Sequence, residues 1–541
     1  MPESNELPRI ASVAGTDSGG GAGLAADQRA ADAFGVHLCP VVAAVTAQNS
    51  VAVTHLEAMP PALLQAQLDA LADDLPPRVL KTGLLGSAAN ARIVARWVDQ
   101  QRRHGPLALV VDPVLRASTG AAFADAELLA AYRTELLPRA TLFTPNQREA
   151  SALLGTEATI PEQAAALRNL GAEAVLITGG DATDPELALD WLEAPHAQGW
   201  LSLPRIATKH THGTGCTLAS AAAAALAHGF TSADAAVLAK QLTAHALRQA
   251  TPQGQGAGPV RAMHGWAGHA TERPLPRLHI GTEAPDAWSA AAHPSALREG
   301  LYGIADSAER IEQLLGAGLR QLQLRIKRPP GLTSAEAERW QSNYQAQLRQ
   351  SLAACDAAGA ILWINDHWQL ALATGARALH LGQEDLLALS ATERDQLRRA
   401  QSEGIALGLS SHSPWELARA AAWTPDYIAC GPVWPTTTKD MPWRPQGLDN
   451  LAWWVANAPA PVVAIGGVLT PEQAGVAKAA GAHSVCVVRG WGPAPSATIP
   501  AWQAALTDDA PTRPRGRDWP HATLPTAPQD RDRALASTIA P

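Results

Sequence analysis

Short apolar runs alternate with helical patterns in the first half of the chain, from Arg9 to about Gly258. The apolar runs are IASVAG, VVAAVTAQ, RVLKTGLL, LALVVDPVL, TLFTP and AVLITGG. The helical patterns cover residues 60–74, 88–101, 217–228 and 233–249. Such alternation is typical of a mostly parallel sheet with helices on both faces. We therefore predict an α/β/α sandwich for this half.

A second alternation begins near Gly300, with eight apolar runs that are each followed by a helical pattern. The runs are LYGIAD, QLQLRI, ILWIND, ALHLG, IALGLSS, YIACGPV, VVAIGG and SVCVVRG. Eight strand–helix pairs in succession indicate a (β/α)8 or TIM barrel. Because 541 residues are too many for one hydrophobic core, two domains are expected, over residues 1–265 and 299–507.

The segments outside these two domains lack sustained periodicity. Residues 266–298 contain many Pro, Gly, Ala and His residues and are predicted to form a linker, which can include packed turns. Residues 508–541 contain Pro and Arg without a pattern and are predicted to be disordered.

The charge and the composition exclude several classes of function. A formal net charge of −8 argues against a protein that binds nucleic acid or an anionic membrane, because such proteins are basic. The first residues, MPESNELPRI, resemble no secretion signal, and no stretch reaches the ~18 uninterrupted apolar residues of a membrane span. We therefore expect a cytoplasmic enzyme with small-molecule partners. A homo-oligomer is neither indicated nor excluded.

Cysteine and lysine are used sparingly. The five cysteines are scattered without a C-x-x-C pair, so we expect neither disulfides nor a zinc site. Of the six lysines, Lys209, Lys327 and Lys439 lie beside polar motifs. Lys240 and Lys478 lie in plain helical patterns, where we expect solvated faces.

Glycines and polar residues gather after the first strands. AGTDSGGGAG follows the first apolar run, and its glycines would let a ligand approach the backbone; Asp27 lies one helical turn further on. Gln48 ends the second run, where a side-chain amide can read a heterocycle. Taken alone, the glycines fit a strand–helix turn without a ligand equally well, and Gln48 fits a loop amide bonded within the protein.

Acidic and amide side chains follow the inner strands. Asp112, Asn146 and Glu149 lie where open α/β sheets bind their ligands. Their oxygen atoms suit Mg²⁺ beside nucleotide phosphates. Glu149 alone could equally be a carboxylate in the first turn of a helix, facing the helix dipole.

The stretch HTHGTGCTLASA opens a helix on glycines. The unpaired N–H groups and positive dipole end of such a helix would make Gly213, Thr214 and Gly215 an anion hole. Cys216 follows, at a position suited to a base. An anion hole and acidic metal ligands in one crevice imply phosphoryl transfer from ATP, with Mg²⁺ as the cofactor.

The motifs AGTD, AQN, TPNxxEA and THGTGC resemble, in this order, those of hydroxymethylpyrimidine kinase / hydroxymethylpyrimidine phosphate kinase over residues 9–266. The resemblance implies a ribokinase-like fold, with the anion hole described above and Mg-ATP organised by Asn146 and Glu149. It also implies that Asp27 and Gln48 bind the pyrimidine and that Cys216 is the catalytic base. A helix N-terminus would lower the thiol pKa and favour the thiolate. The rival interpretation is that Cys216 only packs below the anion hole.

The chain departs from this family's pattern at two places. Its glycine loop reads Ser18-Gly19-Gly20-Gly21, where the family has Pro-Ser-Gly-Gly. The strand that usually ends in Lys-Gly-Gly ends here in Thr178-Gly179-Gly180. Lys209 is the candidate to replace the missing positive charge.

The second domain carries polar groups where barrel enzymes place their chemistry, at the carboxyl ends of strands. Gln323, Arg325 and Lys327 alternate on one face of the second run, as a basic row at the barrel mouth. Asp366 and Asp385 follow the next two runs and supply oxygen ligands for Mg²⁺. The Mg²⁺ ion and the basic row together would hold a diphosphate group as it leaves the substrate. The alternative is an internal salt-bridge network.

A second anion site is predicted at the same mouth. Thr436, Thr438 and Lys439 form a hydroxyl-rich turn, and Gly466 and Gly467 could add backbone N–H groups. Taken alone, PTTTK is equally well an ordinary surface turn. Two anion sites suggest that a phosphorylated molecule is joined to a diphosphorylated one.

The motifs QLRIK, IND, HLGQED, GPVWPTTTK and AIGG resemble thiamine phosphate synthase over about residues 300–506. The resemblance implies that a pyrimidine diphosphate loses pyrophosphate and that a thiazole phosphate captures the resulting cation. The residues implied for the pyrimidine diphosphate are Gln323, Arg325, Lys327, Asn365, Ser410 and Lys439. Those implied for the thiazole phosphate are Thr436, Thr438, Gly467 and the end of the last strand, Val488 and Arg489, where the family has Ser in place of the arginine. Asp366 and Asp385 are implied as the Mg²⁺ ligands.

Together the two resemblances predict a bifunctional enzyme of thiamine biosynthesis. The first domain would phosphorylate 4-amino-5-hydroxymethyl-2-methylpyrimidine twice, and the barrel would consume the diphosphate. One alternative is a non-catalytic, pyrimidine-binding first domain, and Thr178 is its main support. Another is a kinase for pyridoxal-like alcohols.

Overall fold

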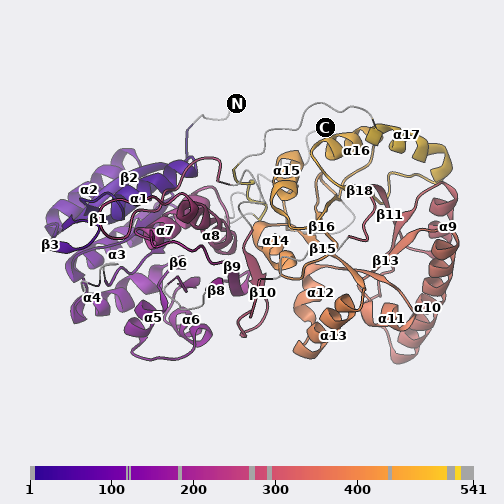
Figure 1. Ribbon diagram of the computed structural model, residues 1–541, viewed down its shortest axis with the longest axis horizontal. Coiled ribbons are helices and arrows are strands. Elements are labelled where there is room, and N and C mark those ends of the chain that lie inside the picture. Colours follow the sequence, from indigo (N-terminus) through magenta and orange to yellow (C-terminus); the bar gives the residue numbers. More distant parts are fainter. Residues whose placement is uncertain are drawn as a thin grey trace. The chain divides into compact units, whose positions relative to one another are not determined.

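The computed structural model in Figure 1 describes residues 6–116, 120, 123–180, 186–266, 275–288, 295–436, 442–507 and 518–524. Tertiary contacts divide the chain into two compact units, Met1–Ser289 and Ala290–Pro541. In the described ranges, no helix is long and apolar enough to cross a membrane.

The first unit is a ten-stranded sheet with helices packed against it. Its strands are β1 (Arg9–Asp17), β2 (His37–Gln48), β3 (Val53–Ala58), β4 (Val79–Thr82), β5 (Ala108–Val111), β6 (Leu142–Phe143), β7 (Val175–Thr178), β8 (Leu187–Glu193), β9 (Gln198–Pro204) and β10 (Arg277–His279). Its helices are α1 (Gly23–Ala33), α2 (Pro61–Asp74), α3 (Ala88–Arg102), α4 (Ala126–Ala131), η1 (Tyr132–Leu136), η2 (Leu137–Arg139), α5 (Gln147–Leu154), α6 (Ile160–Asn169), α7 (Thr214–Ala227) and α8 (Ser232–Arg248).

The strand order is β10-β9-β8-β7-β6-β5-β4-β1-β2-β3. The six strands from β7 to β2 are parallel, whereas β3 at one edge and β8 to β10 at the other pair antiparallel. The six predicted apolar runs are the six parallel strands, and the sandwich is confirmed. Since carboxyl ends of parallel strands meet at one edge of a sheet, the loops after these strands face a common crevice.

Helix α7 covers the centre of this sheet, where it packs against β1, β4 and β5. Half of its residues are buried alanines, whose small side chains let the helix approach the strands closely. Its N-cap is Gly213, in the left-handed region at φ 84°. The helix therefore begins three residues earlier than the apolar pattern predicts, and its first turn contains Thr214, Gly215 and Cys216.

The second unit is the predicted closed barrel of eight parallel strands. The strands are β11 (Gly300–Ala305), β12 (Gln321–Leu324), β13 (Ile361–Asn365), β14 (Ala378–Leu381), β15 (Ala406–Ser411), β16 (Tyr427–Cys430), β17 (Val462–Ala464) and β18 (Ser484–Val487). The helices are α9 (Ala308–Gly316), α10 (Ser334–Ala357), α11 (Trp368–Ala373), α12 (Gln383–Ala388), α13 (Ala391–Ser402), α14 (Pro414–Ala421), α15 (Gly447–Asn457), α16 (Pro471–Ala479) and α17 (Pro495–Thr507). Strand β18 pairs with β11 and closes the ring.

Two segments predicted to lie outside the domains are packed against them. Arg277–His279, in the predicted linker, form β10 and pair with β9, and Leu278 is buried. In the tail predicted to be disordered, residues 518–524 pack on the barrel, and Thr523 is fully buried. These residues therefore belong to the packed units, which the sequence pattern did not indicate, because segments this short carry no readable period.

Candidate active sites

The glycine-rich loop after β1 and the start of α7 lie in direct backbone contact. A Cβ on Gly213 would lie 2.1 Å from the carbonyl oxygen of Gly21, and a Cβ on Gly21 would lie 2.2 Å from the His212 ring. Only glycine fits at either position. Two motifs that are far apart in the sequence therefore form one site, as the phosphoryl-transfer prediction requires.

Asp17 ties this loop together. Its carboxylate accepts the N–H groups of Gly19 at 2.8 Å, Gly21 at 3.0 Å and Ala22 at 2.8 Å, and it lies 2.8 Å from Nε2 of His212. Burial raises the pKa of Asp17, but the hydrogen bonds from His212 and the loop outweigh it and hold the pKa below its usual value. Asp17 and His212 are functional residues that sequence reasoning missed, although both lie within the motifs AGTD and THGTGC.

We expect Asp17→Asn to raise the KM for the pyrimidine about 10-fold, the scale of one lost charge-assisted hydrogen bond. The NH₂ group of the asparagine cannot accept the hydrogen bonds that the backbone N–H groups of the loop donate to Asp17. The loop would therefore lose its fixed shape. Steady-state kinetics of the kinase reaction measure the effect. Asp32→Asn is the control, since this exposed side chain lies near the end of α1 and, among the described residues, accepts a hydrogen bond from Gln28 alone. An unchanged KM would show that the anchor is dispensable.

Gln48, predicted to read the pyrimidine, lies beside this anchor. Ser18 Oγ donates to the Gln48 carbonyl at 2.7 Å and accepts its N–H at 2.8 Å, which fixes the end of β2 to the loop. The side-chain Nε2 lies 3.3 Å from Nε2 of His212. The half-buried amide is thus held at the edge of the loop.

Asp27 and Lys81 form a fully buried ion pair beneath the loop. Lys81 Nζ lies 2.9 Å and 3.1 Å from the two Asp27 carboxylate oxygens, which also accept hydroxyl hydrogen bonds from Ser12 at 2.6 Å and Ser220 at 2.8 Å. Burial opposes the charge on Lys81, but Asp27 outweighs it and raises the pKa of the lysine. With no exposed surface, Asp27 holds other groups in place and does not present an oxygen to a ligand.

Sequence reasoning assigned no role to Lys81. Its position inside an apolar strand run, RVLKTGLL, was the available signal, because a charge buried in a sheet needs a partner.

Cys216 lies in the first turn of α7, and it is the one partly exposed cysteine; the other four are buried. Burial, with the Asp27 and Asp112 carboxylates, raises the pKa of the Cys216 thiol to about 12, although Lys81 opposes the shift. The expectation that the helix N-terminus lowers this pKa is therefore wrong for the ligand-free protein, because desolvation exceeds the dipole effect.

We expect iodoacetamide to alkylate Cys216 at pH 8 on the order of 10³-fold more slowly than an ordinary thiol of pKa ~8.5, because the thiolate is the nucleophile. Peptide mass spectrometry over time measures the rate, and the chain unfolded in urea serves as the control. A folded-state rate equal to that of the unfolded chain would mean that the thiol is activated.

Asp112 follows β5 and faces the anion hole. Its Oδ2 lies 4.0 Å from the position that a Cβ on Gly215 would take. Burial raises the pKa of Asp112 to about 6, although Lys81 opposes the shift. A carboxylate beside the helix N-terminus can therefore gain or lose a proton near neutral pH.

Asn146 and Glu149 form a capping box at the start of α5. Each side chain accepts the backbone N–H of the other at 2.9 Å. Glu149 is thus a carboxylate in the first turn of a helix, which was the alternative interpretation of its position in the sequence. Carboxylate and amide oxygens are ligands that Mg²⁺ prefers, so the chemistry of the pair fits an Mg²⁺ site.

Two lysines lie near this end of the sheet. Lys209, predicted to be catalytic, is exposed on the loop before α7. Lys240 is not solvated as predicted: its Nζ donates to Asp190 Oδ2 at 2.7 Å, and Asp190 Oδ1 accepts the Gly179 N–H at 3.0 Å. The ammonium group of Lys240 therefore lies near the end of β7, where Thr178 replaces the lysine that is usual in the family.

In the barrel, Asp366 and Asp385 lie together at the ends of β13 and β14. Lys327 donates to Asp366 Oδ2 at 2.8 Å, and Asp385 Oδ2 accepts the Gly382 N–H at 2.8 Å. Burial raises the pKa of Asp366, but Lys327 outweighs it and lowers it overall. Burial and the adjacent Asp366 raise the pKa of Asp385. Two facing carboxylates repel each other unless a proton or a cation lies between them, so the pair fits Mg²⁺.

A hydrogen-bonded chain of side chains crosses the barrel interior from buried Gln323 to half-buried Ser410, both of them predicted site residues. Gln323 Nε2 donates to Tyr302 Oη at 3.0 Å, and that oxygen lies 2.9 Å from Tyr427 Oη. Tyr427 Oη lies 2.7 Å from His380 Nδ1, and His380 Nε2 lies 2.9 Å from Ser410 Oγ. Burial lowers the pKa of His380 to about 4, so the imidazole is neutral at neutral pH.

Sequence reasoning missed Tyr302, His380 and Tyr427. Their available signal was polar residues inside apolar strand runs, where a buried polar group needs partners.

The remaining predicted residues lie at the same end of the barrel. Asn365 ends β13, and Arg325 follows β12. A Cβ on Gly467 would lie 2.6 Å from Trp434 Cβ and 2.7 Å from the Pro435 carbonyl oxygen, so the glycine turn packs against the loop that leads to Thr436. Val488 and the exposed Arg489 follow β18. Thr438 and Lys439 lie outside the described residues.

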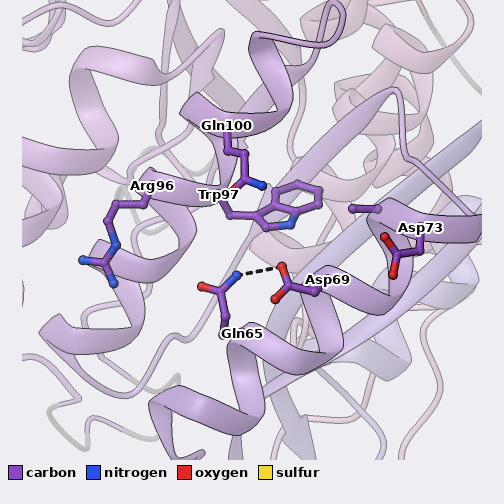
Figure 2. Close-up of a pocket in the computed structure, with 7 residues that line it drawn as sticks. Gln65, Asp69, Asp73, Arg96, Trp97 and Gln100 are labelled. Atoms are coloured by element: carbon purple, nitrogen blue, oxygen red, sulfur yellow. Dashed lines mark hydrogen bonds between the residues drawn. The ribbon is translucent and has the colours of Figure 1, made fainter.

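A surface cavity of about 460 Å³ lies elsewhere, between α2 and α3 (Figure 2). Its lining residues are Gln65, Asp69, Ala72, Asp73, Arg96, Trp97 and Gln100. It contains none of the predicted site residues.

Residues 17–261 match the family described as phosphomethylpyrimidine kinase, and residues 299–491 match thiamine monophosphate synthase. The probable thiamine biosynthetic bifunctional enzyme, chloroplastic, of Oryza sativa subsp. japonica is 33% identical over 477 residues, which cover 85% of this chain and 81% of the rice protein. The chain belongs to the family of bifunctional thiamine biosynthetic enzymes. It is a hydroxymethylpyrimidine and phosphomethylpyrimidine kinase joined to a thiamine-phosphate synthase, which confirms both predicted activities.

Each domain of the bifunctional enzyme also has single-domain relatives. The hydroxymethylpyrimidine/phosphomethylpyrimidine kinase of Synechococcus elongatus is 42% identical over 260 residues, 47% of this chain and 97% of that protein. The thiamine-phosphate synthase of Rhizobium etli is 44% identical over 207 residues, 38% of this chain and 93% of that protein. The kinase domain and the synthase barrel are thus complete units that also occur apart.

Proposed function

We propose that the kinase domain transfers two phosphoryl groups from ATP, one to the hydroxymethyl oxygen of the pyrimidine and one to the resulting monophosphate. The synthase barrel then joins the diphosphate to a thiazole phosphate and releases pyrophosphate. The observation that carries the proposal is the contact between the glycine loop and the start of α7, with the Asp27–Lys81 pair buried beneath them. This contact supports a shared crevice for the alcohol and the transferring phosphate.

In the kinase domain, Gln48 and His212 face the pyrimidine, and the N–H groups of Gly213 and Gly215 receive the phosphoryl group. The N–H of Thr214, also predicted to join the anion hole, donates instead to the Thr211 carbonyl at 3.2 Å. Asn146 and Glu149 would hold Mg²⁺, which neutralises phosphate charge when bound. Asp27 has a positioning role: it fixes Lys81 from below and, through Ser220, fixes α7.

Because its thiol is protonated at neutral pH, Cys216 orients the hydroxymethyl oxygen by a hydrogen bond rather than acting as a preformed thiolate. Positioning and electrostatic stabilisation then supply most of the catalysis, as is general in phosphoryl transfer. Lys81 lies close enough to Asp112 and Cys216 to act on the charge of both.

In the synthase barrel, the basic row of Arg325 and Lys327 holds the diphosphate. Asp366 and Asp385 would hold Mg²⁺, which stabilises the leaving pyrophosphate when bound. Gln323 and Ser410, at the two ends of the buried chain, orient the pyrimidine. Thr436 and Gly467 receive the thiazole phosphate.

The intact chain, supplied with the hydroxymethylpyrimidine and Mg-ATP but no thiazole phosphate, tests the kinase half. We expect ADP to form only when the pyrimidine is present, with the diphosphate as the end product. If no ADP forms while added pyrimidine diphosphate is still converted by the barrel, the first domain is a non-catalytic binding module. Pyridoxal as competing alcohol tests the substrate class, and faster turnover of pyridoxal would overturn the proposal.

A further inference from the structure

Residues 518–524 of the C-terminal tail pack on helix α15 of the barrel, beyond the last residue of the synthase match. The Trp453 indole N–H donates to the Asp518 carbonyl at 3.3 Å. Asn450 and the backbone of His521 bond reciprocally, since the His521 N–H donates to Asn450 Oδ1 at 2.8 Å and Asn450 Nδ2 donates to the His521 carbonyl at 3.1 Å. Trp453 and Asn450 are buried, so the segment is part of the packed domain.

Thr523 joins two loops at the carboxyl end of the barrel. Its Oγ1 donates to the carbonyl of His412, directly after β15, at 2.7 Å. Its carbonyl accepts the N–H of Arg444, in the connection between β16 and α15, at 2.7 Å. The side chain is fully buried. This one residue therefore holds the ends of two loops that border the active site.

The contacts form a closed network around Gln446. Gln446 Nε2 donates to the same His412 carbonyl at 2.7 Å and to the Gly431 carbonyl at 3.3 Å, while its Oε1 accepts Asn450 Nδ2 at 2.9 Å. Nε2 of His521 lies 3.1 Å from the Pro445 carbonyl. Fully buried Gln446 thus links the start of the β16–α15 connection to its end, and the tail covers that end.

The other side of this connection packs against the His412 side chain. Trp443 stacks on the His412 ring, with centroids 5.5 Å apart and an interplanar angle of 10°. Glu416 lies 2.7 Å from His412 Nδ1. Residues 442–446 are therefore held between the His412 ring and the tail segment.

Thr436, to which we assign the thiazole phosphate, lies in the first part of this same connection. Trp434 and Pro435 just before it pack against the Gly467 turn. The Gln446 N–H donates to the Pro432 carbonyl at 2.7 Å, and the Gly447 N–H donates to the Val433 carbonyl at 3.0 Å, so the start of α15 holds the residues that lead to Thr436. Misplacing a binding group by about 1 Å can cost up to 100-fold in rate.

We propose that residues 518–524 are a positioning element of the synthase site: Thr523 fixes Arg444 and the His412 carbonyl, and Gln446, held in the same network, fixes the residues that lead to Thr436, to which we assign the thiazole phosphate. The segment touches no substrate and acts through the connection. The proposal rests on the role assigned to Thr436, and synthase turnover by the intact chain tests that role separately.

The test compares four proteins: the intact chain, a chain that ends after Leu524, a chain that ends after Thr507, and the full-length Thr523→Val variant. Valine keeps the shape and the backbone acceptor but removes the hydroxyl donor. We expect the chain ending after Leu524 to match the intact chain. The chain ending after Thr507 should show a KM for thiazole phosphate raised about 10-fold, and Thr523→Val a smaller rise of the same kind.

The KM for the pyrimidine diphosphate and the kinase kinetics should stay unchanged in all four proteins, which a merely structural loss would not give. Unaltered kinetics in Thr523→Val and in the chain ending after Thr507 would overturn the proposal. An equal loss for both synthase substrates, with lower thermal stability, would also overturn it and leave the tail a structural cap on α15.

Discussion

Replacing Lys81 with methionine is expected to destabilise the kinase domain by about 3–5 kcal/mol, the usual cost of removing one partner of a buried ion pair. Asp27 would keep its hydroxyl donors, Ser12 and Ser220, but lose the only cation among its hydrogen-bond donors in the described structure. Hydrogen exchange read peptide by peptide measures the change in each domain. The expected result is faster exchange across β1, β4 and α7 and unchanged exchange across the barrel strands.

The barrel is an internal control for this variant, because its synthase reaction should continue when pyrimidine diphosphate is supplied. Adding Asp27→Asn to Lys81→Met should restore part of the lost stability, since no unpaired charge then remains buried. Protection in β1 and α7 that is unchanged by Lys81→Met would contradict the account of a charged pair beneath the site.

Replacing Asp366 with asparagine is expected to lower synthase kcat/KM by roughly 10³-fold, since metal stabilisation of leaving-group charge is worth several kcal/mol. The substitution also removes the partner of Lys327. Kinetics at increasing Mg²⁺ concentration measure the effect, and the variant should need far more Mg²⁺ to reach half of its maximal rate.

Asp356→Asn, at an exposed position at the end of α10, is the matched control and should leave synthase kinetics unchanged. Kinase activity of both variants should equal that of the intact chain. If Asp366→Asn kept the Mg²⁺ dependence of the intact chain, the carboxylate pair would not be the metal site.

The fold could be predicted wherever the burial of a strand or helix produces a recognisable pattern of apolar residues in the sequence. The eight barrel strands and the inner parallel strands of the first unit are largely buried on both faces and appear as apolar runs, and β2, which has exposed positions such as Val45, is still apolar in sequence. Strands β3, β8, β9 and β10 escaped prediction: they pair antiparallel at the sheet edges, where an alternating or very short pattern resembles a loop.

The candidate sites were predictable where polar residues follow strands, as with Asp112, Gln48, Asp366 and Asp385. Residues within strands and helices were missed or misjudged, because sequence shows a charged residue but not its partner. Lys240 shows this well: it was expected to be solvated, and its partner Asp190 lies on β8. Cys216 shows a different case: it lies at the start of a helix as expected, but the direction of its pKa shift is opposite to the prediction.

The central claim, that one chain carries both reactions and that the first feeds the second, is tested most directly by stoichiometry. The intact chain is given the hydroxymethylpyrimidine, Mg-ATP and thiazole phosphate, and ADP, pyrophosphate and thiamine phosphate are measured together. We predict about two ADP and one pyrophosphate for each thiamine phosphate formed, the ratio that two phosphoryl transfers and one condensation require. Thiamine phosphate that forms only when pyrimidine diphosphate is added would contradict the account.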